Sequence, residues 1–392
     1  MNNRCLSCLV IIVAIVFYCY EFYLRIFPST ILGPLMLHFN VTPLVITEIL
    51  ASYYLSYALG QLPAGIILDR YGANRVLPLA GLISVLGLLI FIGSKEPILA
   101  ELGRIVLGLG SAFALLGVLK MTRDYLPARY FSRVVGITIA LGTLMAANVE
   151  VISMRFVAGS NWMMLFAGSI VIGLILSLVL WLGMKKLIRP FDESHALTWG
   201  QMWQELKVLL KNKPLWLNAS IGGLFYAPTS ALAALYGSYF LSHHYAFSPD
   251  RSAYCISLLF LGWAVGSPLV GWISDKIHYE LPIIRSCALF ASAISFTIVS
   301  AHVEKTDYIE LLMFLFGFFS SAQILVWKLF NSLVPSHAAG TGAALTNMLI
   351  MIIVGGVQLL FGYGLMLWSN GCAILILPLC LAATIFISFL AK

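Results

Sequence analysis

Apolar runs of about 20 residues, the length that lets a helix cross a bilayer, repeat along the whole chain between short polar segments. Six runs precede a longer polar break, and they cover residues 8–30, 46–68, 76–93, 98–120, 134–156 and 163–184. Six more follow the break, over residues 216–241, 253–274, 283–301, 309–330, 342–367 and 373–390. The pattern therefore predicts twelve transmembrane helices in two sets of six.

The polar break separates two predicted domains. We assign residues 1–184 to an N-terminal six-helix bundle, 185–214 to a cytoplasmic linker and 215–392 to a C-terminal six-helix bundle. The linker stretch TWGQMWQELKVLL carries apolar side chains on one side of a helix, namely Met202, Leu206, Leu209 and Leu210. We expect this amphipathic helix to lie along the membrane surface.

Composition also indicates a protein surrounded by lipid. The 392 residues are 61% hydrophobic and 10% charged, whereas soluble domains are about 25% charged. Because the bilayer interior offers the backbone no hydrogen-bond partners, runs of this length must be helical. The expected fold class is an all-α integral membrane protein. Its first apolar run is interpreted as a retained span, since it is longer than the apolar part of a signal peptide.

Lysine and arginine are unevenly distributed over the predicted loops. With a cytoplasmic N-terminus, the inner segments contain Arg70, Arg75, Arg123, Arg129, Arg133, Lys185, Lys186, Arg189, Lys207, Lys211, Lys213, Lys276 and Arg285. The outer segments contain Lys95, Arg251 and Lys305. The positive-inside rule then places both termini in the cytoplasm, and we expect the inner (plasma) membrane of a bacterium. No nucleic acid partner is expected, because the basic residues are scattered over short loops.

The sequence offers no support for metal, cofactor or enzyme chemistry. Cys5 and Cys8 form a single CxxC pair, and His243 and His244 are adjacent at an outer helix end. Without a second pair or a mixed cluster, these are interpreted as residues of the membrane edge rather than as a metal site. The short loops contain no nucleophile–base pair and no ligand-binding domain. We expect no cofactor, no bound metal and no catalytic residue.

The two halves of the chain are repeats of one another. GQLPAGIILDR, residues 60–70, returns as GSPLVGWISDK, residues 266–276, with both glycines and the acid–base pair in register. Lys120 and Lys328 occupy nearly equivalent positions, each seven residues before a proline. Their place in the repeat favours a structural role at the inner helix ends. A duplicated six-helix unit is the layout of an alternating-access carrier, with a site between the halves near the membrane midplane.

Two motifs resemble those of the major facilitator superfamily. GIILDRYGANR, residues 65–75, is similar to that superfamily's loop between helices two and three, and RIVLGLG, residues 104–110, to its fourth-helix motif. The resemblance assigns gating residues, which are Gly65, Asp69, Arg70, Gly72 and Arg75, with Asp275 and Lys276 in the second copy. The fourth-helix residues are Arg104, Gly108 and Gly110. Arg104 is expected to order the N-terminal bundle or to assist proton movement.

The resemblance also implies contacts for the gating motif. It places Asp69 near the start of helix eleven, around residues 340–342, where a carboxylate favours a helix N-terminus. By the repeat, Asp275 is expected to do the same at the start of helix five. Asn74 departs from the family pattern, since many members have another basic residue there.

YEFYLRIFPS, residues 20–29, places two charged residues inside the first span. Charges in a span are costly and normally face a partner or a wet cavity, so Glu21 and Arg25 are candidate functional residues. Tyr18, Glu21 and Arg25 share one helix face, and Pro28 loosens the turn beyond them. Counted from Cys8 at 1.5 Å per residue, Glu21 lies about 20 Å into the span, near or just past its middle. The alternative is a structural ion pair between Glu21 and Arg25.

The first two helices resemble those of the superfamily's organic-anion and phosphate-ester carriers, in which an arginine of helix one contacts the anionic substrate. This implies that Arg25 binds a carboxylate, and that Glu21 couples transport to protons or binds a substrate amine. Phosphate esters are not expected, because those carriers use a second arginine on helix seven and residues 218–241 contain none. The Tyr-Cys-Tyr-Glu run also resembles the superfamily's lysosomal dipeptide carrier, so a zwitterionic substrate remains open.

Further polar residues are candidates for substrate binding on other predicted spans. They are Tyr54 and Tyr57 on helix two, Tyr226 and Tyr236 on helix seven, Gln323 on helix ten and Asn347 on helix eleven. For each, hydrogen bonding between helices is an equally good interpretation. Glu150 is a second candidate proton-coupling acid, placed deeper in its span than Arg155.

Two functions remain open at this stage. The first is a proton-coupled carrier of a small organic anion or zwitterion, with protons, a small-molecule substrate and membrane lipid as partners and a monomeric chain. The alternative is an efflux carrier for drugs or siderophore-like compounds. Against efflux, residues 136–156 lack the glycine–proline signature of the superfamily's drug antiporters.

Overall fold

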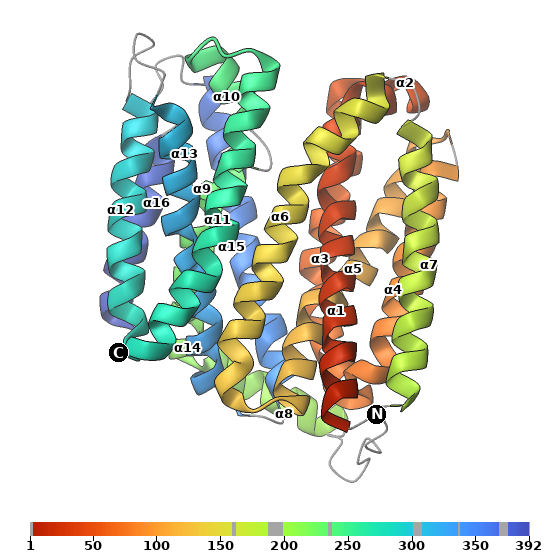
Figure 1. The fold of residues 1–392 in the computed structure, drawn as a ribbon, viewed down its shortest axis with the longest axis vertical. Helices are drawn as coiled ribbons and strands as arrows, with labels where there is room; N and C mark the ends of the chain where they lie inside the picture. Colours follow the sequence, from red (N-terminus) through yellow and green to blue (C-terminus); the bar gives the residue numbers. More distant parts are fainter. Residues whose placement is uncertain are drawn as a thin grey trace. The chain divides into compact units, whose positions relative to one another are not determined.

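The computed structural model describes residues 3–93, 95–158, 162–186, 199–233, 237–300, 308–335, 338–367 and 375–391. All regular secondary structure in these segments is helical (Figure 1). The all-α prediction is therefore confirmed for the described part of the chain.

Internal contacts divide the chain into two units. Unit 1 comprises Met1–Phe131, Val149–Lys211 and Val334–Met348, and unit 2 comprises Ser132–Asn148, Asn212–Leu333 and Leu349–Lys392. The helices of unit 1 are α1 (Asn3–Ile26), α2 (Leu32–Phe39), α3 (Pro43–Tyr71), α4 (Ala73–Gly93), α5 (Pro97–Tyr125), α7 (Trp162–Lys186) and α8 (Trp199–Lys211). Those of unit 2 are α9 (Lys213–Ala231), α10 (Gly237–His244), α11 (Pro249–Ile277), α12 (Glu280–Ser300), α13 (Ile309–Ser320), α14 (Leu325–Leu333) and α16 (Ile376–Leu390). Helices α6 (Phe131–Ala158) and α15 (Ala339–Leu367) contribute to both units.

Each predicted span falls on an observed helix or helix pair. Within the described segments, eight helices are long and apolar enough to cross a membrane, and two shorter apolar helices are also found. The outward faces of these helices carry large apolar side chains that remain exposed, as expected of surfaces that face lipid. The chain is therefore an integral membrane protein.

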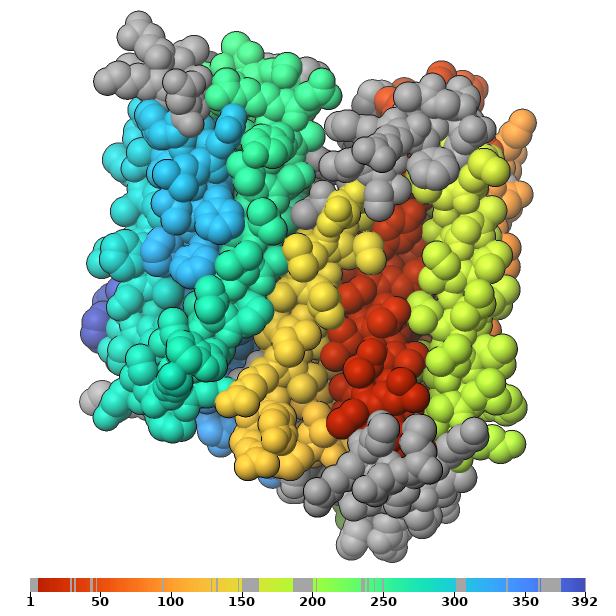
Figure 2. All heavy atoms as spheres, in the orientation of Figure 1, coloured from red at the N-terminus to blue at the C-terminus, as the bar shows by residue number. Residues whose placement is uncertain are grey.

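Unit 1 is organised around α5. Helices α3 and α4 pack along it, α4 also packs on α7, and α1 contacts both α5 and α7. Figures 1 and 2 show α1 and α7 side by side on one face of the unit. Glycine allows α3 and α5 to pack closely, because a side chain at Gly108 of α5 would overlap the backbone of Tyr53 in α3. The aromatic rings of α3 are thereby held against α1 and α5.

Unit 2 repeats this pattern with different residues. Helix α11 packs along α13, α12 packs on α13 and α16, and α16 also packs on α9. The interior contains large apolar side chains, among them Phe225, Leu259 and Phe316.

Two predicted spans are interrupted by 3₁₀ turns within the described residues. Helix α1 ends at Ile26, and a 3₁₀ turn at Phe27–Ile31 follows because Pro28 cannot continue the α-helical ladder. The seventh predicted span covers α9, which contains Pro228, and part of α10. The tenth is divided by a 3₁₀ turn at Ser321–Ile324, where the Ser321 hydroxyl donates to the carbonyl of Phe318 at 2.6 Å.

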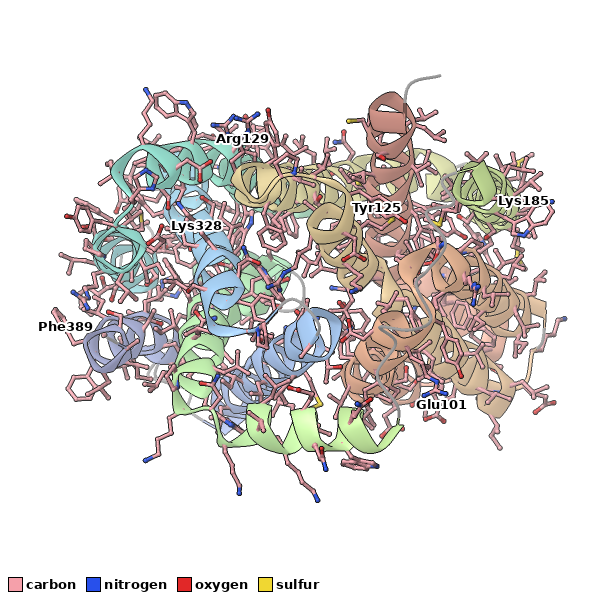
Figure 3. The ribbon with its side chains drawn as sticks, turned by 90° about the horizontal axis from the view of Figure 1, so that it is seen from below. Glu101, Tyr125, Arg129, Lys185, Lys328 and Phe389 are labelled. Atoms are coloured by element: carbon pink, nitrogen blue, oxygen red, sulfur yellow. The ribbon has the colours of Figure 1, made fainter. Side chains whose placement is uncertain are left out.

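Helix α8 follows the predicted amphipathic stretch. In Figure 3 it is seen along its side, whereas the spanning helices of unit 1 are seen nearly end-on. Leu206 and Leu209 are buried, and Leu210 is 43% exposed. The three residues lie within about 100° of one another around α8, on one side of the helix. The side chain of Met202 lies outside the described part of the chain.

Candidate functional site

Glu21 is enclosed by three helices of unit 1. Its side chain is 2% exposed, and Oε2 accepts a hydrogen bond from the hydroxyl of Ser111 in α5. The hydroxyl of Ser84 in α4 is also near Glu21, but it does not reach hydrogen-bond geometry. Oε1 has no hydrogen-bond partner in the described part of the chain. A buried carboxyl with one unsatisfied oxygen is costly, which is typical of a functional group rather than a structural one.

Arg25 lies one helical turn beyond Glu21 but does not pair with it. Within the described residues, no carboxylate oxygen lies within 4.0 Å of the Arg25 guanidinium. The alternative of a direct structural ion pair is therefore wrong for this conformation. The two charged groups of YEFYLRIFPS point to different surroundings.

Aromatic rings surround the Arg25 guanidinium. Its Cζ atom lies 4.3 Å from the ring centroid of Tyr57, 5.1 Å from that of Phe22 and 5.8 Å from that of Tyr53. Arg25 Nε donates to the Tyr53 hydroxyl at 3.4 Å, a long hydrogen bond. The side chain is only half-buried, so its remaining N–H groups are not closed off by protein. Tyr18 shares this face of α1, with its ring 5.8 Å from that of Phe22.

Arg104 is fully buried beside the same group of rings. Its Nη1 donates at 3.2 Å to the carbonyl of Leu24, and its Cζ lies 4.6 Å from the centroid of Tyr53. The α-helical donor for that carbonyl would be the N–H of residue 28, which is a proline and has none. Arg104 thus satisfies the carbonyl that the break in α1 leaves without its helical partner.

A network of buried polar side chains links α3 to α15 within unit 1. Asn347 Nδ2 donates to Gln61 Oε1 at 2.9 Å and to the Tyr57 hydroxyl at 3.3 Å. Gln61 Nε2 in turn donates to the carbonyl of Ala112 at 3.3 Å. All three side chains are buried. Because Tyr57 also lies against Arg25, this network extends from the charged site to α15.

Asp69 caps the start of α15. Its carboxylate accepts hydrogen bonds from the backbone N–H groups of Gly340 and Thr341, at 3.0 and 2.7 Å, and from the Thr341 hydroxyl at 2.9 Å. Ala338, which precedes the helix, has no capping side chain, so the cap comes from α3. Lys120 Nζ lies 3.5 Å from Asp69 Oδ1. This is the contact that the resemblance implied for Asp69.

Gly65 allows this contact because α3 and α15 approach closely. A Cβ atom at Gly65 would lie 2.5 Å from the carbonyl oxygen of Gly340, so any side chain would separate the helices. Gly72 ends α3 with a φ of 78°, a conformation that other residues rarely adopt. The two glycines of the motif therefore serve packing and helix termination.

Asp275 makes a different set of contacts in unit 2. It lies 3.2 Å from Lys328 Nζ and 3.3 Å from Arg133 Nε, near the start of α6. Asp275 therefore lies at the start of α6, where the repeat placed it, and among the described residues its donor there is the Arg133 side chain. Lys328 also contacts Glu280 at 2.9 Å, so this lysine takes part in two ion pairs, in agreement with a structural role.

The other motif residues lie around these contacts. Arg70 lies over the ring of Tyr71, Lys276 over that of Trp272, and Arg75 is exposed next to Asn74, whose Oδ1 accepts from the Arg75 N–H. Gly110 fits against Ser84 in α4. It thereby brings α4 and the adjacent Ser111 of α5 to Glu21.

The remaining sequence candidates are dispersed. Tyr54 is 40% exposed, with its ring against Tyr53, and Gln323 is buried in the 3₁₀ turn of unit 2. Tyr226 packs edge-on against Trp263 at 5.6 Å. Tyr236 and the side chain of Glu150 lie outside the described part of the chain.

Sequence reasoning overlooked Tyr53 and Ser111. Tyr53 precedes Tyr57 by one helical turn, and Ser111 directly follows the fourth-helix motif. Both residue types are common on interhelical surfaces, so neither position stands out in a sequence.

An all-helical membrane protein with an internal repeat and charged side chains inside its spans has the layout of a membrane transporter. The chain belongs to the Major Facilitator Superfamily, whose family model matches residues 7–358. It is therefore a secondary transporter. No curated protein sequence matches it significantly.

Solved structures of the same fold cover the whole chain. XylE, a proton:xylose symporter solved with 6-bromo-6-deoxy-D-glucose, is 14% identical with a TM-score of 0.74, covering 100% of this chain and 97% of that one. FucP in the outward conformation is 14% identical with a TM-score of 0.70, covering 98% and 99%. A variant of the E. coli fucose:proton symporter FucP is 14% identical with a TM-score of 0.67, covering 97% and 99%. At such identities the likeness establishes the fold and leaves the substrate open.

Proposed function

We propose that this transporter carries a small organic anion or zwitterion, such as a carboxylate, an amino acid or a short peptide, and couples its movement to protons by alternating access. The observation that carries the proposal is Arg25, a half-buried cation without a carboxylate partner among the described residues. A cation inside a span is costly unless an anion or water meets it. An anionic substrate would provide that partner.

The surroundings of Arg25 suit a carboxylate. The guanidinium is planar and offers parallel N–H groups that match the two oxygens of a carboxylate. The faces of Phe22 and Tyr57 stabilise the cation without using its N–H groups. Most of its donors thus remain available for an anion.

Glu21 is the candidate for proton coupling. Its carboxyl is buried beside Ser111 and has no ion-pair partner in the described part of the chain. A buried carboxyl changes its interaction with its neighbours strongly when it gains or loses a proton. Loading and release of a proton at Glu21 would therefore favour different states of the transporter. Glu150 remains a second candidate on sequence grounds.

The structural relatives raise one competing substrate class. FucP and XylE are described as proton symporters of fucose and xylose, which agrees with proton coupling here. A neutral sugar, however, would leave the Arg25 charge without a partner. No observation in the described segments favours the efflux alternative.

Orientation and organisation are part of the same proposal. The excess of lysine and arginine on the inner segments supports cytoplasmic termini in a bacterial inner membrane. We further propose six-helix bundles at residues 1–184 and 215–392, joined by residues 185–214, and a monomeric chain.

A ligand screen tests the substrate class. Thermal unfolding of the purified protein would be measured with succinate, alanine, dialanine, glycerol 3-phosphate, fucose or xylose. A ligand held at about 100 times its Kd should stabilise the protein by about 2.7 kcal/mol. We expect a carboxylate-bearing compound to stabilise the wild type, Arg25→Lys to weaken its binding at least tenfold, and Arg25→Gln to abolish the shift.

Arg129→Gln is the matched control, because Arg129 is exposed and lies over Tyr130. It should respond like the wild type. Stabilisation by sugars alone, or an unchanged response of Arg25→Gln to carboxylates, would contradict the proposed substrate class.

A further inference from the structure

Helix α8 carries an exposed stripe of one aromatic and two basic residues. Trp203, Lys207 and Lys211 follow one another at intervals of four and therefore share one side of the helix. Trp203 is 62% exposed, and both lysines are exposed. Figure 3 shows nitrogen-tipped side chains projecting from one side of α8.

Apolar side chains flank this stripe. Val208 is 64% exposed and Leu210 is 43% exposed, whereas Leu206 and Leu209 are buried. Val208 lies about 160° around the helix from Leu206, so exposed apolar side chains are not confined to the buried side. Exposed tryptophan, valine and leucine beside lysine are typical of a helix in the membrane interface.

The two lysines also lack protein partners. Two lysines near the ends of other helices are paired: Lys120 with Asp69 and Asp124, and Lys328 with Asp275 and Glu280. In the described part of the chain, by contrast, neither Lys207 nor Lys211 forms an ion pair or a hydrogen bond. Their positive charge is therefore available to an external anion.

The ends of the spanning helices show a related arrangement. Lys185 lies 5.3 Å from the ring centroid of Trp181 at the end of α7 (Figure 3). Lys276 lies 3.8 Å from that of Trp272 at the end of α11. Tryptophan rings and lysine side chains of this kind mark the level of the lipid headgroups. Trp203 and Lys207 of α8 repeat this spacing of four residues between tryptophan and lysine.

We infer that α8 is a docking site for anionic phospholipids, whose headgroup phosphates contact Lys207 and Lys211 while Trp203, Val208 and Leu210 enter the acyl boundary. The inference is independent of the transported substrate. It commits to a lipid rather than a free phosphate, because only a lipid covers the exposed apolar residues as well as the lysines.

Lipid binding would be measured on the full-length protein in detergent. Phosphatidylglycerol, or phosphatidylcholine with the same chains, would be titrated, and the shift in unfolding temperature recorded for the wild type and for Lys207→Gln/Lys211→Gln. Each lysine should contribute about fivefold to the affinity for an anionic headgroup at low salt. We therefore expect the double variant to need at least tenfold more phosphatidylglycerol for half of the shift.

Three controls separate this result from other causes. Lys95→Gln removes an exposed lysine from a different loop and should behave like the wild type. Lys207→Arg/Lys211→Arg keeps the charge and should retain binding. Soluble glycerol 3-phosphate should not reproduce the shift. Equal titrations of the wild type and the glutamine variant, equal effects of the two lipids, or a full effect of the soluble phosphate would overturn the inference.

Discussion

At the residue scale, Arg104 shows how one side chain compensates for a helix break. Its guanidinium is fully buried, with no acidic partner in the described residues, yet it donates to the Leu24 carbonyl and lies over the rings of Tyr53 and Phe91. Tyr53 also contacts Arg25, so the two arginines share this tyrosine as a neighbour. Both arginines were recognisable in the sequence as charges in a span, but the sequence did not show that both contact Tyr53.

A double-mutant cycle tests whether Arg104 compensates for the backbone N–H that Pro28 lacks. Arg104→Met should destabilise the protein by about 1–3 kcal/mol, since it leaves the buried Leu24 carbonyl without its donor. Pro28→Ala restores an N–H to residue 28, so the loss should be smaller in Arg104→Met/Pro28→Ala. Unfolding by sodium dodecyl sulfate in mixed micelles gives the four free energies.

The same cycle with Arg104→Lys is the control, because lysine retains one donor and should lose less stability. Strictly additive losses in the Arg104→Met cycle would show that the Leu24 carbonyl is not the link.

At the element scale, α3 forms a seam along α15. Tyr57, Gln61, Gly65 and Asp69 recur every fourth residue on α3, and they meet Asn347, Ala344 and Gly340 of α15. The motif GIILDRYGANR predicted the Asp69 end of this seam. The Asn347 end was not predicted, because an asparagine in an apolar run does not specify its partner.

Asp69→Asn should loosen the start of α15, whereas Asp275→Asn should have little effect there. Charge-assisted hydrogen bonds to a buried carboxylate contribute about 1.5–3 kcal/mol, so exchange of the Gly340 and Thr341 amides should accelerate about 10- to 100-fold in Asp69→Asn. Hydrogen–deuterium exchange of peptides from residues 338–348 measures this.

Asp275→Asn serves as the counterpart from the other repeat. Its partner Arg133 has a side chain that is 54% exposed, and exposed pairs contribute about 0–1 kcal/mol. Equal acceleration at Gly340 in both variants would show that the cap by Asp69 does not hold the helix start.

At the scale of the whole molecule, the two repeats preserve one ion pair and differ in its surroundings. Lys120 with Asp69 and Lys328 with Asp275 occupy equivalent positions. Asp69 is buried and caps a helix, whereas Asp275 is more exposed and contacts Arg133. The charged site of Glu21 and Arg25 has no counterpart in the repeat pattern. The duplication therefore explains the ion pair that both repeats share, whereas the charged residues Glu21 and Arg25 occur in the first repeat alone.

Proton coupling is the prediction for the complete transport cycle. The wild type in proteoliposomes should take up the anion identified by the ligand screen faster when the outside is more acidic than the lumen. Glu21→Gln keeps the shape but has no titratable proton, so it should lose this response while still exchanging the anion across the membrane. Uptake of the anion with and without a pH gradient measures both effects. Wild-type uptake that is equally fast in both conditions would exclude coupling.

The sequence by itself determined the spans, the repeat and the charges inside the membrane. Lipid imposes helices on any long apolar run, and it makes every charge in a span conspicuous. Glu21 and Arg25 were accessible for that reason, whereas the contact of Asp69 with α15 was implied by the resemblance of its motif to a known family. The tertiary structure alone decided that Glu21 meets Ser111, that Arg25 lies among aromatic rings and that Arg104 serves the carbonyl left by Pro28. These contacts join residues 28 to 90 positions apart, and no local pattern encodes which faces of α1, α3 and α5 meet.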